Sequence, residues 1–168
     1  VPFTPLIRGG GQQMGRRAGT EGVAEVVGMG VAADWCLNGL KNNSRPDQLR
    51  NRLEQLLAQQ VTDIRFNGQD APRLPNTCNV SFKHLSAGTI LSALSECEVY
   101  ASAGAACGAL ATKSSHVLLA MQVPGDYVQG AIRFSLGRGL TSADITALVE
   151  KVAEVVVRQR LQLRVATG

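Results

Sequence analysis

The sequence predicts an α/β domain in which a small sheet is covered by helices. Stretches with apolar residues at helical spacing alternate with short stretches in which apolar and polar residues alternate. An apolar fraction of 45% in 168 residues is enough for one hydrophobic core. The expected order of elements is helix, helix, strand, strand, helix, strand, helix, strand and helix, which is typical of a layered domain.

The chain is expected to open with a glycine-rich loop and two helices. The loop over residues 9–19 is followed by Thr20, which can cap a helix over residues 21–40; loose amides at a helix start also favour an anion. A plain capped loop is the alternative interpretation. Gly28 and Gly30 predict close packing of the first helix, and a capping-box pattern at Ser44 starts a second helix that ends near Gln60.

The middle of the chain is expected to supply strands. Residues 61–66 form a probable strand, and alternation over residues 78–82 predicts a strand that buries Cys78. A helix over residues 89–97 and a short strand over residues 99–101 then lead into small residues only. The first reactive side chain after them is the thiol of Cys107, placed on a loop where nucleophiles are commonly displayed. A small, structural cysteine at a strand end is the alternative.

The last elements are a short helix, a strand and a long helix. Ser114 or Ser115 caps a helix through Met121. Apolar residues alternate with polar ones over residues 132–137, so Arg133 should project from the face opposite the core. Because an unpaired buried charge is costly, Arg133 needs an anionic partner, either a protein carboxylate or a ligand. The last helix begins near Thr141 and is expected to fray into a basic tail.

Composition excludes several classes of function. The basic residues behind the net charge of +4 are scattered and aromatic residues make up only 4%, so nucleic-acid binding is not expected. No apolar run is long enough to span a membrane, and no signal peptide is visible. The four cysteines form no Cys-x-x-Cys pair, so a metal site is not expected and a reducing, cytoplasmic setting is favoured. The start at Val1 indicates a cut within a longer protein.

Four segments, in order, resemble the selenocysteine lyase and cysteine desulfurase family of pyridoxal-phosphate enzymes, which have the class-V aminotransferase fold. These are the glycine-rich segment over residues 9–20, the segment over residues 73–79, the cysteine loop over residues 102–107, and residues 132–138. Residues 73–79 look most like the selenocysteine lyase branch. The resemblance covers nearly the whole chain and implies the C-terminal small domain, an α+β unit with a mostly antiparallel sheet.

The resemblance also implies residue roles. Cys107 would be the nucleophile that takes selenium or sulfur from the substrate and leaves L-alanine. Arg133 would bind the substrate carboxylate, and Thr20 would bind the phosphate of pyridoxal 5'-phosphate, usually across a homodimer interface. Residues 1–20 would belong to the lead-in and phosphate loop of the large domain. Residues 21–168 would form the linking helix and the small domain with the cysteine loop.

One departure from the family matters. The lysine that anchors the cofactor stands in a His-Lys pair upstream of the glycine-rich loop, and none of the lysines here stands in such a motif. We therefore expect the chain alone to be inactive. The main hypothesis is part of a selenocysteine lyase acting on L-selenocysteine. The alternatives are a cysteine desulfurase that forms a persulfide on Cys107, with an acceptor protein for the sulfur, and a non-catalytic binding module.

Overall fold

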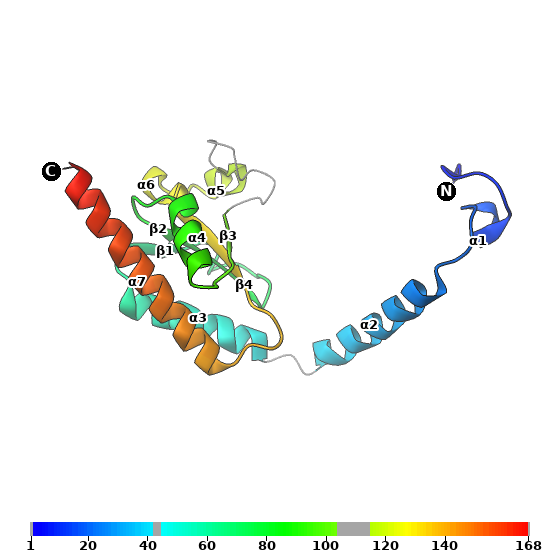
Figure 1. Ribbon diagram of the computed structural model, residues 1–168, viewed down its shortest axis with the longest axis horizontal. Coiled ribbons are helices and arrows are strands. Elements are labelled where there is room, and N and C mark those ends of the chain that lie inside the picture. Colours follow the sequence, from blue (N-terminus) through cyan, green and yellow to red (C-terminus); the bar gives the residue numbers. More distant parts are fainter. Residues whose placement is uncertain (1, 42–44, 104–114, 168) are drawn as a thin grey trace. The chain divides into compact units, whose positions relative to one another are not determined.

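The computed structural model describes residues 2–41, 45–103 and 115–167. Its contacts divide the chain into two compact units, Val1–Asn43 and Ser44–Gly168, which are considered separately. Figure 1 gives the elements along the chain.

The N-terminal unit consists of a loop, a single turn and one long helix. The turn α1 (Gln12–Gly15) is not a regular helix, because Gln13 and Met14 have positive φ values of 51° and 57°. The helix α2 spans Val23–Lys41, so it begins three residues after Thr20. A Cβ added at Gly28 or Gly30 would meet no atom within 4 Å, so the close packing expected from these glycines is not observed.

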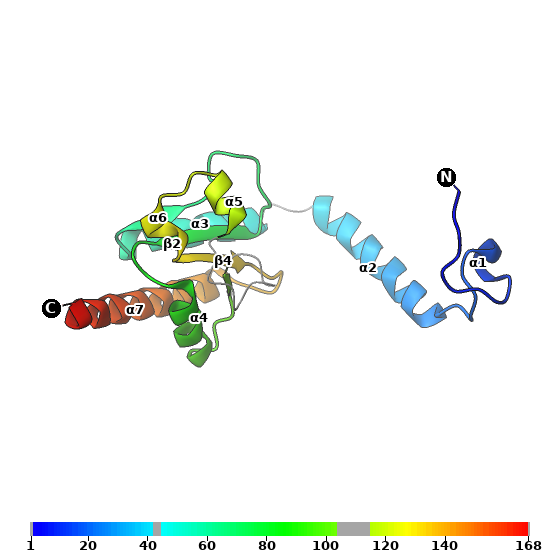
Figure 2. The ribbon, with the colours of Figure 1, turned by 90° about the horizontal axis from the view of Figure 1, so that it is seen from above.

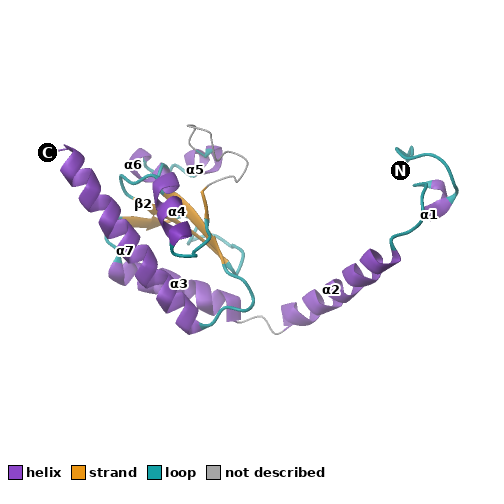
Figure 3. Ribbon diagram, in the orientation of Figure 1, coloured by secondary structure: helices purple, strands orange, loops and turns teal. Residues whose placement is uncertain are grey.

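The C-terminal unit contains the sheet and the remaining helices. Its elements are α3 (Arg45–Gln60), β1 (Ile64–Phe66), β2 (Thr77–Phe82), α4 (Ala87–Glu96), β3 (Ser102–Ala103), α5 (His116–Ala120), α6 (Gly125–Val128), β4 (Ala131–Ser135) and α7 (Ser142–Thr167). The strand order is β1-β2-β4-β3, and every neighbouring pair is antiparallel. The expected small antiparallel sheet covered by helices is confirmed (Figure 3).

One face of this sheet packs on the core. Cys78, Val80 and Phe82 of β2 are fully buried, and they share one cluster with the apolar stripes of α3, α4 and α7. The stripe of α7 is Ile145, Val149, Val152, Val155 and Val156. Figure 2 shows α4 and α7 on one side of β4, and α5 and α6 on the other. The second side has its own small apolar cluster of Leu118, Val123, Val128 and Ala131.

Two boundaries differ from the expectation. The strand predicted over residues 99–101 is displaced to β3, because Glu98 adopts a φ of 59° and the Val99 amide bonds to the carbonyl of Leu94. The backbone therefore closes α4 before it pairs with β4. The basic tail does not fray, since α7 stays helical through Thr167. Its start is fixed as expected, with Thr141 donating its amide to the Asp144 carboxylate at 2.7 Å.

Candidate functional site

The face of the sheet opposite the core carries Arg133. Along β4 the buried residues Ile132 and Phe134 alternate with exposed Arg133 and Ser135, as the sequence pattern predicts. Among the described residues, none accepts a hydrogen bond from the Arg133 guanidinium or forms an ion pair with it. Arg133 is exposed, so the choice between a protein carboxylate and a ligand as its partner stays open.

Arg133 is flanked by polar side chains on both neighbouring strands. It lies opposite Asn79 of β2 and opposite Ser102 of β3. Directly opposed residues of antiparallel strands share a face and have Cβ atoms about 5 Å apart. Asn79 and Ser102 are both half-buried. The three side chains therefore form a row across β2, β4 and β3.

Two hydrogen bonds from Asn67 hold Asn79 in place. Its side-chain oxygen accepts a hydrogen bond from Asn67 Nδ2 at 2.7 Å, and its backbone carbonyl accepts the amide of Asn67 at 2.8 Å. Asn67 is only 7% exposed and also donates to Ser81 Oγ at 2.8 Å. Because the Asn79 oxygen is engaged, its Nδ2 is the group left to meet a ligand. Sequence reasoning missed this residue, since only the strand register brings it beside Arg133.

Cys107, the expected nucleophile, lies outside the described residues, and so does the rest of its loop after Ala103. The described part of the approach is Ser102–Ala103, which is paired with β4 so that Ser102 is opposite Arg133. The roles expected for Cys107 and Arg133 require both side chains to face the same space, and this requirement stays a prediction.

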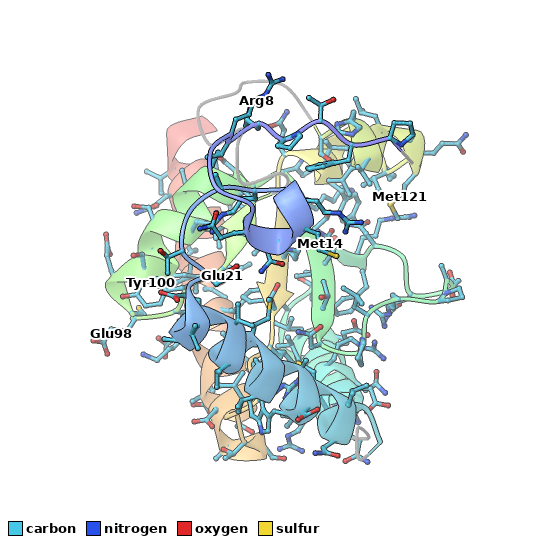
Figure 4. The ribbon with its side chains drawn as sticks, turned by 90° about the vertical axis from the view of Figure 1, so that its right-hand side faces the viewer. Arg8, Met14, Glu21, Glu98, Tyr100 and Met121 are labelled. Carbon is cyan, nitrogen blue, oxygen red and sulfur yellow. The ribbon has the colours of Figure 1, made fainter. Side chains whose placement is uncertain are left out.

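Thr20 lies in the loop before α2 in the N-terminal unit. It does not cap that helix, because α2 begins at Val23 and the first α2 hydrogen bond runs from the Val26 amide to the Gly22 carbonyl. Arg17 holds the loop by donating to the carbonyls of Gly19 and Thr20, at 3.0 Å each. The Thr20 residue is exposed. Arg8, earlier in the same loop, projects outward (Figure 4).

These residues fit one part of pyridoxal phosphate and not another. The exposed Thr20 hydroxyl can donate a hydrogen bond to a phosphate oxygen. The described lysine side chains do not fit the covalent anchor: Lys83 is paired with Asp126 at 3.3 Å, and Lys151 donates to the carbonyl of Cys97 at 3.1 Å. The expectation that the anchoring lysine comes from outside this chain stays a prediction.

A charged network supports the connection between β1 and β2. Arg73 donates to both oxygens of Glu54 on α3, and Gln69 donates to the same carboxylate at 3.2 Å. Burial alone would raise the pKa of Glu54, but the hydrogen bonds and the Arg73 charge outweigh it and hold that pKa below its usual range. Burial, followed by the nearby Glu54 charge, raises the pKa of the Cys78 thiol strongly. Cys78 is thus structural, as expected.

Two other kinds of site are not supported by the described part of the chain. No group of three or more metal-ligating side chains is found there. None of the described helices is both long and apolar enough to cross a membrane. An apolar depression runs along α7, on the other side of the sheet from Arg133, and is lined by Ala153, Glu154, Val157, Arg158, Leu161 and Gln162. It brings no nucleophile together with Arg133.

The profile of the aminotransferase class-V family matches residues 8–148. The chain is 43% identical over 161 residues to a cysteine desulfurase of Nostoc sp., covering 95% of this chain and 40% of the relative. It is 38% identical over 159 residues to the cysteine desulfurase NifS of Azotobacter vinelandii, covering 94% of this chain and 40% of that protein.

A solved structure agrees with these sequence matches. A NifS-like protein from Rickettsia africae matches with a TM-score of 0.77 and 29% identity, covering 92% of this chain and 40% of that one. The chain therefore spans about 40% of the length of these relatives.

Proposed function

The chain belongs to the aminotransferase class-V family, and on that basis we propose that it is the C-terminal portion of a pyridoxal-phosphate-dependent cysteine desulfurase. The observation that supports the proposal most directly is Arg133, an exposed guanidinium without a protein partner among the described residues, on the face of the sheet opposite the main core. The relatives named above are cysteine desulfurases. Their names favour this alternative over selenocysteine lyase, the main hypothesis from the sequence.

In this proposal each residue has one task. Arg133 binds and orients the carboxylate of L-cysteine in the bidentate geometry that suits a guanidinium. Thr20 donates its hydroxyl to the cofactor phosphate, and the anchoring lysine comes from outside the described residues. When bound, the cofactor supplies an electron sink next to the substrate α-carbon. The Cys107 thiolate attacks the substrate sulfur, so that an S–S bond forms as the Cβ–S bond breaks. L-Alanine leaves after Cβ gains a proton, and Cys107 holds a persulfide.

The proposal also covers the domain organisation and the assembly of the enzyme. Residues 1–20 supply the lead-in and phosphate loop of the large domain, and residues 21–168 supply the linking helix and the small domain. The complete enzyme is proposed to be a cytoplasmic homodimer that passes sulfur to an acceptor protein. A thiolate needs a lowered pKa to react near neutral pH, and a nearby cation or the cofactor can provide it.

A chain exchange tests the function. The matching segment of the Nostoc cysteine desulfurase is replaced by this chain. Alanine formation from L-cysteine and, separately, from L-selenocysteine is then measured with pyridoxal phosphate and a thiol reductant. We expect an active hybrid in which Cys107→Ala lowers the rate at least about 100-fold, the loss expected when an essential nucleophile is removed. Cofactor absorbance before the assay shows whether the hybrid has assembled.

The possible outcomes separate the hypotheses. A hybrid that binds the cofactor but makes no alanine from either substrate would support the non-catalytic binding module. A hybrid that is active on L-selenocysteine only would restore selenocysteine lyase as the main hypothesis. Full activity in Cys107→Ala would remove the assigned nucleophile.

A further inference from the structure

We infer that Asn79 and Ser102, together with Arg133, form a three-donor subsite for the α-carboxylate of a small amino acid. This inference rests on the proposed function for the role of Arg133 and extends it to two residues on the neighbouring strands. Nothing in the sequence motifs assigns either residue a role. Their assignment follows from the register of β2, β4 and β3.

The register places the three donors on one face. Arg133 has Asn79 opposite it on one neighbour and Ser102 on the other. Asn79 and Ser102 each have a Cβ atom about 5 Å from that of Arg133, on opposite sides of it, so a carboxylate held by Arg133 lies between two further donors. A guanidinium binds both oxygens in its own plane, and each oxygen retains a lone pair for a further donor.

The hydrogen bonds around Asn79 decide which of its groups meets the ligand. Its oxygen is occupied by Asn67 Nδ2 at 2.7 Å. Asn67 is itself fixed by the backbone bond to Asn79 and by its bond to Ser81 Oγ, and it is 7% exposed. The Asn79 side chain is therefore oriented before any ligand arrives, and the group turned away from Asn67 is an NH₂ donor.

The charged residues on the face of the sheet that carries Arg133 favour an anionic ligand. The strand positions of this face are Arg65, Thr77, Asn79, Ser81, Ser102, Ala131, Arg133 and Ser135. Two of these residues are arginines and none is acidic. Arg133 is exposed and has no protein partner among the described residues, so its carboxylate-binding geometry is available to a ligand. Two neutral hydrogen-bond donors beside one guanidinium suit a ligand that is planar and carries one negative charge, as a carboxylate does.

The test is a titration of the 168-residue chain followed by ¹⁵N NMR at constant ionic strength. The probe is L-alanine, the product of the proposed reaction. L-Alaninamide, which lacks the carboxylate, and inorganic phosphate are the controls. We expect L-alanine to shift the backbone amide of Arg133 and the side-chain NH₂ of Asn79, and L-alaninamide to shift neither. A larger response to phosphate than to L-alanine would overturn the assignment to a carboxylate.

Variants then separate the donors. Asn79→Ala and Ser102→Ala should each weaken L-alanine binding about tenfold or more, as expected for one hydrogen bond to a charged carboxylate. Ser135→Ala, an exposed residue on the same face and strand as Arg133, is the matched control and should leave binding unchanged. Arg133→Ala should abolish binding. Circular dichroism of each variant establishes that it folds.

Each failure has a separate meaning. If Arg133 responds to L-alanine but the Asn79 NH₂ does not, and Asn79→Ala binds equally well, the inference is wrong while the role of Arg133 in the proposed function stands. If Arg133 itself does not respond, the inference and the carboxylate-binding role both fail in this chain. The wild-type NH₂ signal decides the role of Asn79 even if its variant does not fold.

Discussion

Glu54 and Arg73 form a two-bond ion pair between α3 and the segment that connects β1 to β2. Arg73 Nη1 lies 2.6 Å from Glu54 Oε1, and Arg73 Nη2 lies 2.8 Å from Glu54 Oε2. The Glu54 side chain is only 7% exposed, whereas that of Arg73 is 20% exposed. The pair fixes a long connection just before β2, and β2 carries both Cys78 and Asn79.

Removal of the Arg73 side chain should destabilise the fold. Arg73→Ala leaves the buried Glu54 carboxylate without its main partner, and we expect a loss on the order of 3 kcal/mol in the free energy of unfolding. Urea denaturation followed by circular dichroism measures it. Arg65→Ala, which removes an exposed arginine of β1, is the control and should change stability by less than about 0.5 kcal/mol. Equal stability of wild type and Arg73→Ala would contradict a structural role for the pair.

The same pair predicts a dependence of stability on pH. The folded-state pKa of Glu54 lies below its ordinary value of 4.5, so its contribution is fully present above that value and is lost as the pH falls through the folded-state pKa. Glu54→Gln should be less stable than wild type at neutral pH, and the two curves should converge in acid. Asp144 also has a lowered pKa, caused by hydrogen bonds from Thr141, so both proteins are compared in the Asp144→Asn background. Parallel curves would refute the prediction.

Cys78 should be unreactive in the native protein. Its side chain is fully buried, and burial together with the Glu54 charge raises the pKa of its thiol. Since the thiolate is the reactive form, alkylation by iodoacetamide at pH 8 should modify Cys78 at least about 100 times more slowly than half-buried Cys97. Peptide mass spectrometry gives both rates. In denaturant the difference should vanish, and rapid native labelling of Cys78 would show that the core opens.

Gly130, the residue before β4, should not tolerate a side chain. A Cβ there would overlap the carbonyl oxygen of Phe82 and lie 3.0 Å from that of Leu85. We expect Gly130→Ala to lower the free energy of unfolding by about 3 kcal/mol. The control is Gly125→Ala in α6, where a Cβ meets no atom within 4 Å and where a small gain or no change is expected. Thermal unfolding of both variants provides the comparison, and similar melting temperatures would argue against the close approach.

The sequence predicts the regular elements where one periodicity dominates. The α7 stripe of Ile145, Val149, Val152 and Val156 is buried as its helical spacing indicates. Alternation along β4 places Arg133 on the face opposite the main core. The strand expected over residues 99–101 fails for a local reason, because the left-handed Glu98 closes α4 and delays pairing until Ser102. Composition alone does not reveal that backbone turn.

The long-range features of the site could not be derived in this way. Asn79 ends the segment over residues 73–79 that carries part of the resemblance, but no role follows for it until the strand order β2-β4-β3 puts it beside Arg133. Glu54 and Arg73 are 19 residues apart, and a glutamate within a helix pattern suggests a solvated face rather than a buried pair. Arg133 could be singled out because an arginine on a half-buried strand needs a partner, whereas the identity of its neighbours depends on register.

The outer strand β1 has three residues, against six in its neighbour β2. A foreign strand that approached the β1 border would find few backbone groups to pair with, and Arg65 would bring its charge to that border. Fibril growth by edge-to-edge addition is therefore disfavoured at this edge of the sheet.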